Sequence, residues 1–161
     1  MKKGLTTIGI IAGLVILVIG SYFVSYRWLF PYLHNQTLKQ FSEPLIGITP
    51  SPGIQKIDSI SEVGQQSGNS DHCDYLAAQL LKTDLPKSEI EKYYRSNYKG
   101  KTELNFFWTD EPHKPGIGAV NPTNISTLDE WVNTKSKMTG ANLIIYIFEE
   151  GLTSAFDYRC S

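Results

Sequence analysis

The most prominent pattern in the chain is an uninterrupted apolar run near the N-terminus. From Gly4 to Val24 no residue carries a charge, and isoleucine, valine, leucine and glycine predominate. As a helix, this run would be about 30 Å long, which is the thickness of the hydrocarbon layer of a bilayer. A cleaved signal peptide would need small residues before the cut, whereas bulky aromatic residues stand between Gly20 and Ser25. The pattern therefore predicts that residues 1–25 form an uncleaved transmembrane signal anchor.

The charges around the apolar run predict its orientation. Lys2 and Lys3 precede it, and Arg27 is the one basic residue that follows it closely. The positive-inside rule then places the N-terminus in the cytoplasm and residues 26–161 outside it. We therefore expect a single-pass protein of the cell membrane whose C-terminal domain is extracytoplasmic.

The predicted anchor also indicates two kinds of partner. Residues 4–24 are expected to contact the lipid bilayer along their whole length. Gly9 and Gly13 form a GxxxG pair, a spacing that lets two membrane helices approach closely. A protein partner or a homodimer through this pair is a second expectation.

The first residues resemble a known leader sequence. Residues 2–8 read KKGLTTI, which is similar to the leader of type IV prepilins, where cleavage follows the glycine. The resemblance implies an alternative function, a pilin-like filament subunit that is processed after Gly4 and whose N-terminal helix packs against its neighbours. Gly9 stands where that family has a glutamate that neutralises the new terminal amine.

Downstream of the anchor, residues 26–54 read as a neck and connector. The segment is polar and aromatic at first and is interrupted by Pro31. Further prolines recur from Pro44 onward, which is typical of irregular structure. We expect the globular domain to occupy residues 55–161.

Hydrophobic periodicity within the domain predicts two helices. Residues 86–98 begin with a proline and carry apolar and aromatic side chains at helical spacing. Thr127 and Glu130 form a capping box that opens a second, shorter helix, with Leu128 and Trp131 facing inward.

A β-hairpin is predicted at the C-terminal end of the chain. Residues 142–149 are rich in β-branched and aromatic residues, and residues 152–160 place their larger apolar residues on one face by the period of two. The two segments flank a Glu-Gly pair that suits a two-residue loop. On the second strand the alternation would place Tyr158 and Cys160 on one face and Asp157 on the other.

Two further strands complete the predicted sheet. Residues 103–109 alternate in the same way. Residues 73–83 contain alanines and leucines that also suit a helix, but a helix there would run directly into the start of the next one, so we expect a strand. The fold class is therefore α+β, with an N-terminal transmembrane helix followed by a small antiparallel sheet that packs with one or two helices.

One block of the domain resembles other sequences. It is similar to uncharacterised bacterial proteins, secreted or membrane-anchored, in the segments Cys73-Asp74-Tyr75, Thr83-Asp84-Leu85, Glu89-Ile90 and Tyr93-Tyr94. The resemblance implies a small extracytoplasmic domain, and it implies no activity and no site residue.

Composition narrows the possible functions. The chain has 161 residues with 15 Lys+Arg against 16 Asp+Glu, which argues against a large multidomain enzyme and against a dedicated nucleic-acid binder. No P-loop, HExxH or GxSxG motif is present in the sequence. We expect a non-enzymatic binding or envelope-interaction role, with a hydrolase that uses carboxylates such as Asp71 and Asp74 as a third alternative.

The two cysteines are the main candidates for site chemistry. Cys73 and Cys160 both lie in the part expected to be extracytoplasmic, where a cysteine pair is most simply a disulfide. His72 is adjacent to Cys73, but in a strand the two side chains point to opposite faces. His34 and His113 have no ligand spacing to a partner in the sequence. We therefore expect a disulfide and no metal, cofactor or catalytic residue.

Overall fold

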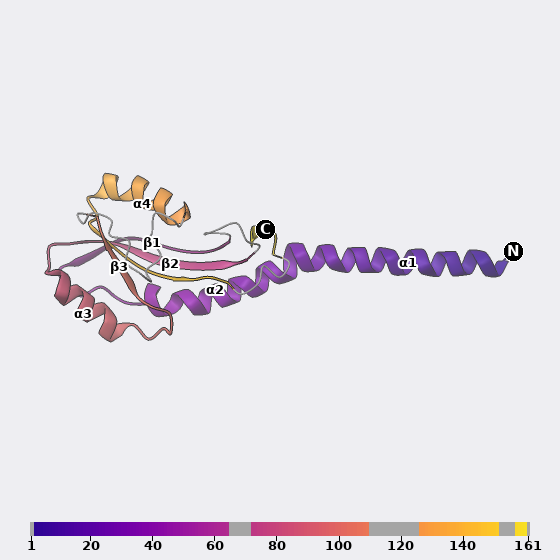
Figure 1. The fold of residues 1–161 in the computed structure, drawn as a ribbon, viewed down its shortest axis with the longest axis horizontal. Helices are drawn as coiled ribbons and strands as arrows, with labels where there is room; N and C mark the ends of the chain where they lie inside the picture. The colour runs from indigo at the N-terminus through magenta and orange to yellow at the C-terminus, as the bar shows by residue number, and fades with distance from the viewer. Residues whose placement is uncertain (1, 65–71, 110–125, 152–156, 161) are drawn as a thin grey trace.

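The computed structural model describes residues 2–64, 72–109, 126–151 and 157–160 (Figure 1). The chain begins with one continuous helical rod, and the α+β domain sits at the far end of that rod. The rod consists of the helix α1 (Lys2–Val24), the π-helical turn η1 (Ser25–Leu29) and the helix α2 (Phe30–Ile46). In Figure 1, α1 projects away from the domain, while α2 runs along the sheet.

The sheet has four antiparallel strands in the order β1-β2-β4-β3. The central strands β2 and β4 are buried at almost every position, which explains why their sequences are apolar on both faces. Both faces need cover, and Figure 1 shows α2 and α3 against one face and α4 against the other. The bounds are β1 (Ile54–Gly64), β2 (Asp74–Thr83), α3 (Lys87–Asn97), β3 (Asn105–Trp108), α4 (Ser126–Thr139) and β4 (Leu143–Glu149).

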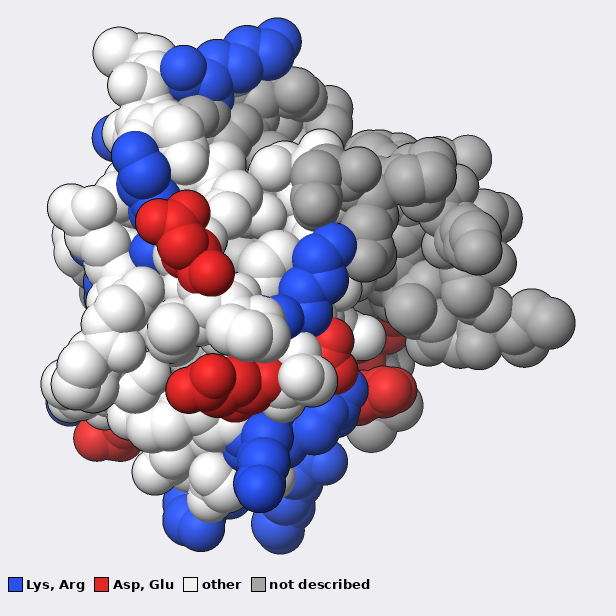
Figure 2. All heavy atoms as spheres, turned by 90° about the vertical axis from the view of Figure 1, so that its left-hand side faces the viewer, with Lys and Arg blue, Asp and Glu red and all other residues white. Residues whose placement is uncertain are grey.

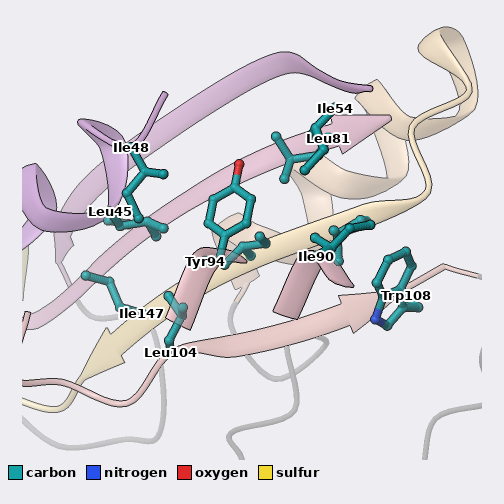
Figure 3. Close-up of a cluster of buried hydrophobic side chains, with 12 residues drawn as sticks. Leu45, Ile48, Ile54, Leu81, Ile90, Tyr94, Leu104, Trp108 and Ile147 are labelled. Carbon is teal, nitrogen blue, oxygen red and sulfur yellow. The ribbon is translucent and has the colours of Figure 1, made fainter. Parts of the chain in front are cut away.

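The larger part of the core lies between the sheet and the pair α2 and α3. Leu45 from α2 and Ile90 and Tyr94 from α3 are fully buried against the sheet (Figure 3). On the opposite face Leu128 of α4 is fully buried in a second cluster with Ile144 of β4. The expected α+β class with an antiparallel sheet and an N-terminal apolar helix is therefore confirmed.

Residues 26–43, expected as a neck, are helical, and the helix continues to Ile46, so the irregular connector spans residues 47–53 and does not begin at Pro44. Pro31 lies in the first turn of α2, where a missing N–H costs little. The preceding turn is π-helical, and the N–H of Phe30 bonds to the carbonyl of Ser25. Pro44 lies inside the last part of α2. Regular structure resumes at β1, an edge strand that the sequence pattern did not predict because many of its residues are polar.

The predicted second strand of the C-terminal hairpin is also wrong in the part that the structure describes. Tyr158–Cys160 is the short 3-10 helix η3, and residues 152–156 lie outside the described residues. Asp157 and Cys160 are buried, whereas Tyr158 is 41% exposed. In a strand, Tyr158 and Cys160 would share one face and Asp157 would lie on the other. Hydrogen bonds from Arg159 to α2 hold this segment in place.

Candidate functional site

The apolar helix exposes its side chains on every side. Within the described residues one helix, Gly9–Ile46, is long and apolar enough to cross a membrane, and its most apolar part is 0% buried in the fold. Ile16 and Leu17 are 71% and 67% exposed. Around Gly9 and Gly13, no atom beyond the backbone of the same helix lies within 4 Å of the position that a Cβ would take. An exposed apolar surface of this size is consistent with contact with lipid, because water is a poor solvent for it.

Aromatic side chains connect the end of this helix with the C-terminal segment. The ring of Tyr22 stacks on Tyr26 with the two planes 9° apart. The centroid of Tyr26 lies 6.2 Å from that of Tyr158, and the guanidinium of Arg27 lies 4.6 Å from the centre of the same Tyr158 ring. These contacts place η3 beside the turn where α1 becomes α2.

A buried charged pair fastens η3 to α2. Asp157 is 1% exposed, and its carboxylate accepts several hydrogen bonds from Arg159, including one of 2.6 Å from Nη2 to Oδ2 and one of 3.0 Å from Nε to Oδ1. Arg159 also donates to Oδ1 of Asn35 at 2.7 Å and to the carbonyl of Pro31 at 3.1 Å. One guanidinium therefore links the C-terminal segment to the first two turns of α2.

Electrostatics keeps this pair ionised. Burial alone would raise the pKa of Asp157, but the hydrogen bonds and positive charge of Arg159 outweigh it and lower that pKa below its usual value. The same hydrogen bonds raise the pKa of Arg159, against the opposite effect of burial. Since an ionised carboxylate only accepts, the His34 Nδ1 that lies 3.0 Å from Asp157 Oδ2 carries the proton of that hydrogen bond.

The disulfide lies directly against this network. Cys73 and Cys160 are bonded to each other across 87 positions of sequence, and both are at most 1% exposed. Cys73 immediately precedes β2 and Cys160 ends η3. This agrees with the pairing expected from the sequence, although the bond reaches a 3-10 turn and not a last strand.

His34 is the site residue that sequence reasoning missed. Its Nδ1 lies 3.0 Å from Cys73 Sγ, and the ligand atoms of His34, Cys73, Asp157 and Cys160 all lie within 4.8 Å of one another. No local spacing indicates this, because His34 is 39 positions from Cys73 and 123 from Asp157. We call this group the junction cluster, defined as His34, Cys73, Asp157, Arg159 and Cys160.

The other candidate histidine takes no part in the junction cluster. His72 Nε2 lies 3.0 Å from Oδ1 of the fully buried Asp74, at the start of β2. Asp71, the other carboxylate considered for hydrolysis, and His113 lie outside the described residues. The structure therefore brings His72 and Asp74 together as a local pair.

The end of the domain opposite α1 carries mixed charge. Figure 2 shows basic and acidic side chains interleaved over the described part of that face. Opposite charges this close together reduce the field of each sign. The described part of this face therefore presents no single-signed patch that would attract a strongly charged partner.

No protein-family model, curated protein or solved structure matches this chain. The functional argument therefore depends on the geometry of the apolar helix and the junction cluster.

Proposed function

We propose that the protein is a single-pass membrane protein that holds a small α+β domain outside the cytoplasm, in a non-enzymatic binding or envelope-interaction role. The observation that carries the proposal is the Cys73–Cys160 disulfide beside the base of an unburied apolar helix. Disulfides persist in oxidising compartments and are rare in the cytosol. The domain then lies on the oxidising side, and Lys2 and Lys3 remain on the cytoplasmic side.

The junction cluster gives this anchor a fixed geometry. Because α2 continues α1, packs on the sheet through Leu45 and accepts hydrogen bonds from Arg159, no flexible linker separates α1 from the domain. Since α2 lies along the sheet, the domain sits directly at the end of the anchor (Figure 1). The anchor would therefore hold the domain close to the bilayer surface in a fixed orientation, as suits a protein that binds a partner there.

Site-directed labelling tests the orientation. Met138 is 79% exposed on α4, so Met138→Cys in intact bacterial cells should react with a membrane-impermeant maleimide. The matched variant Lys3→Cys should react only after the cells are lysed. The opposite pattern, with Lys3→Cys labelled in intact cells, would contradict the proposed topology.

A second candidate function is a pilin-like filament subunit. The resemblance of the leader is one reason. A second reason is the arrangement of the helices, because the exposed apolar helix α1 continues into α2, which packs on an antiparallel sheet. In that case the exposed face of α1, including Gly9 and Gly13, would pack against other copies. The intact mass of the mature chain distinguishes the two functions. Loss of residues 1–4 with a new N-terminus at Leu5 supports the filament subunit, whereas retention of residues 1–4 supports the anchor.

A further inference from the structure

The junction cluster contains a set of atoms that can bind a metal ion. Two sulfur atoms, one imidazole nitrogen and one carboxylate oxygen converge from α2, from the start of β2 and from η3. As long as the two sulfur atoms are bonded to each other, they cannot act as thiolates, and only the thiolate is a metal ligand. Reduction would turn the same four side chains into a ligand set.

We propose that the chain with Cys73 and Cys160 reduced binds one zinc ion through both sulfur atoms, His34 Nδ1 and an oxygen of Asp157. Zinc prefers four tetrahedral ligands drawn from Cys, His and carboxylate groups. Imidazole and thiolate donors together favour zinc over magnesium or calcium, which prefer oxygen. This site is independent of the membrane topology proposed above, because it depends only on the folded domain and its redox state.

The four ligand atoms have to rearrange over about 1–2 Å. Nδ1 of His34 is 3.0 Å from Cys73 Sγ and 3.0 Å from Asp157 Oδ2, and all four atoms lie within 4.8 Å of one another. In a tetrahedral zinc site with bonds of about 2.0–2.3 Å, neighbouring ligand atoms are about 3.3–3.8 Å apart. The imidazole therefore has to move by less than about 1 Å from each neighbour, the most distant ligand atoms have to approach by about 1 Å, and the two sulfur atoms separate once the bond between them is broken.

Burial and the hydrogen bonds from Arg159 also suit an ion. Cys73, Asp157 and Cys160 are each at most 1% exposed, whereas the His34 side chain is 14% exposed and gives a path of entry. Arg159 Nε donates to Oδ1 of Asp157, and this hydrogen bond can stay in place while Oδ2, which also accepts from Arg159 Nη2, binds the metal through its other lone pair.

Reduction of the disulfide followed by zinc binding conserves electrons, protons and charge. A dithiol or phosphine reductant supplies two electrons, breaks the sulfur–sulfur bond and leaves two protein thiols. Zinc then displaces the two thiol protons, and the proton of His34 moves from Nδ1 to Nε2. Two thiolates and one carboxylate contribute three negative charges, which the zinc ion and the Arg159 guanidinium neutralise.

The consequence is that either of two crosslinks can hold η3 against the start of β2. The disulfide does so in the oxidised chain, and the metal, which would also bind His34 of α2, does so when the cysteines are reduced. The C-terminal segment would then stay in place during the interval before oxidation, and oxidation would release the ion.

Cobalt titration tests the proposal on the purified full-length chain in detergent. After anaerobic reduction and removal of the reductant, we expect one cobalt ion per chain, with the intense visible bands of tetrahedral cobalt and a sulfur-to-cobalt charge-transfer band. One equivalent of zinc should abolish both signals. The oxidised chain should give neither.

Two histidine variants distinguish a built site from loose binding by two thiols. His34→Gln should weaken cobalt binding at least tenfold, and the control His72→Gln, which alters the histidine next to Cys73, should bind as the unaltered chain does. Both variants are first shown to form the disulfide when oxidised, which checks that they fold. Equal affinities of the two variants, or the absence of a tetrahedral spectrum from the reduced chain, would overturn the proposal.

Discussion

Replacing Gln79 with leucine should destabilise the domain. Gln79 is 0% exposed on β2, and its Nε2 donates to the carbonyl of Leu45 at 2.8 Å. Its Oε1 accepts a hydrogen bond of 3.1 Å from the hydroxyl of Tyr94. One buried side chain therefore joins the end of α2 to α3.

The magnitude follows from the hydroxyl that is left without a partner. Leucine is similar in volume but has no polar atom, so Gln79→Leu would leave the Tyr94 hydroxyl buried and unsatisfied. The Leu45 carbonyl would keep the hydrogen bond of 3.1 Å that it accepts from the N–H of Ile48. An unsatisfied buried group costs about 1–3 kcal/mol. We therefore expect the free energy of unfolding to fall by about 1–3 kcal/mol, a sizeable part of the stability of a small domain.

A double-mutant cycle in denaturant measures this directly. Tyr94→Phe alone should cost about 1–2 kcal/mol. The double variant should cost at least about 1 kcal/mol less than the sum of the single changes, because it removes both partners of one hydrogen bond. The control is Tyr93→Phe, whose hydroxyl donates to Thr49 at an exposed site and should matter little. Additive effects, or a change below about 0.5 kcal/mol for Gln79→Leu, would refute the reasoning.

Three further predictions concern the junction and the core. Replacing both Cys73 and Cys160 with alanine opens a loop of 87 positions and should lower the free energy of unfolding by about 4–5 kcal/mol, measured in denaturant. Arg159→Leu leaves the buried Asp157 carboxylate without its main partner and should lower the thermal midpoint by several degrees, a loss that an unchanged midpoint would disprove. Burial, with a smaller effect of Glu103, raises the pKa of Tyr146 to about 12. The neutral Tyr146 phenol therefore contributes fully to stability below the ordinary tyrosine pKa of about 10, and this contribution is lost as the pH rises towards 12. In a plot of the free energy of unfolding against pH, Tyr146→Phe should reduce the slope between these two values.

Most elements of the fold could be predicted from local patterns in the sequence. The uncharged run of α1, the proline at the start of α3, the alternation in β3 and the β-branched and aromatic run of β4 each reflect the environment of a single element, so the sequence predicts them. Residues 73–83 were ambiguous by propensity, and the order of neighbouring elements decided correctly for a strand. The polar edge strand β1 was missed, because its pattern differs little from that of a loop.

The contacts that hold the domain to its helix were not predictable in this way. Gln79 reads as a polar interruption of an apolar strand, and only the arrangement of α2 and α3 gives it partners. His34 has no neighbour in sequence that indicates a site, because Cys73 and Asp157 come from distant segments. The 3-10 turn at the C-terminus depends on the same long-range contacts, which override the alternation of its residues.

The central claim is that an inserted helix holds the domain outside the cytoplasm with its junction oxidised. The most direct test is the thiol state of the unaltered chain in membranes. Cells are quenched in acid, the membranes are washed with alkaline carbonate, and the denatured chain is treated with a maleimide of large mass. We expect the chain to stay in the membranes and to gain no maleimide before reduction and two after it. Two maleimides without prior reduction, or release of the chain by carbonate, would contradict the account.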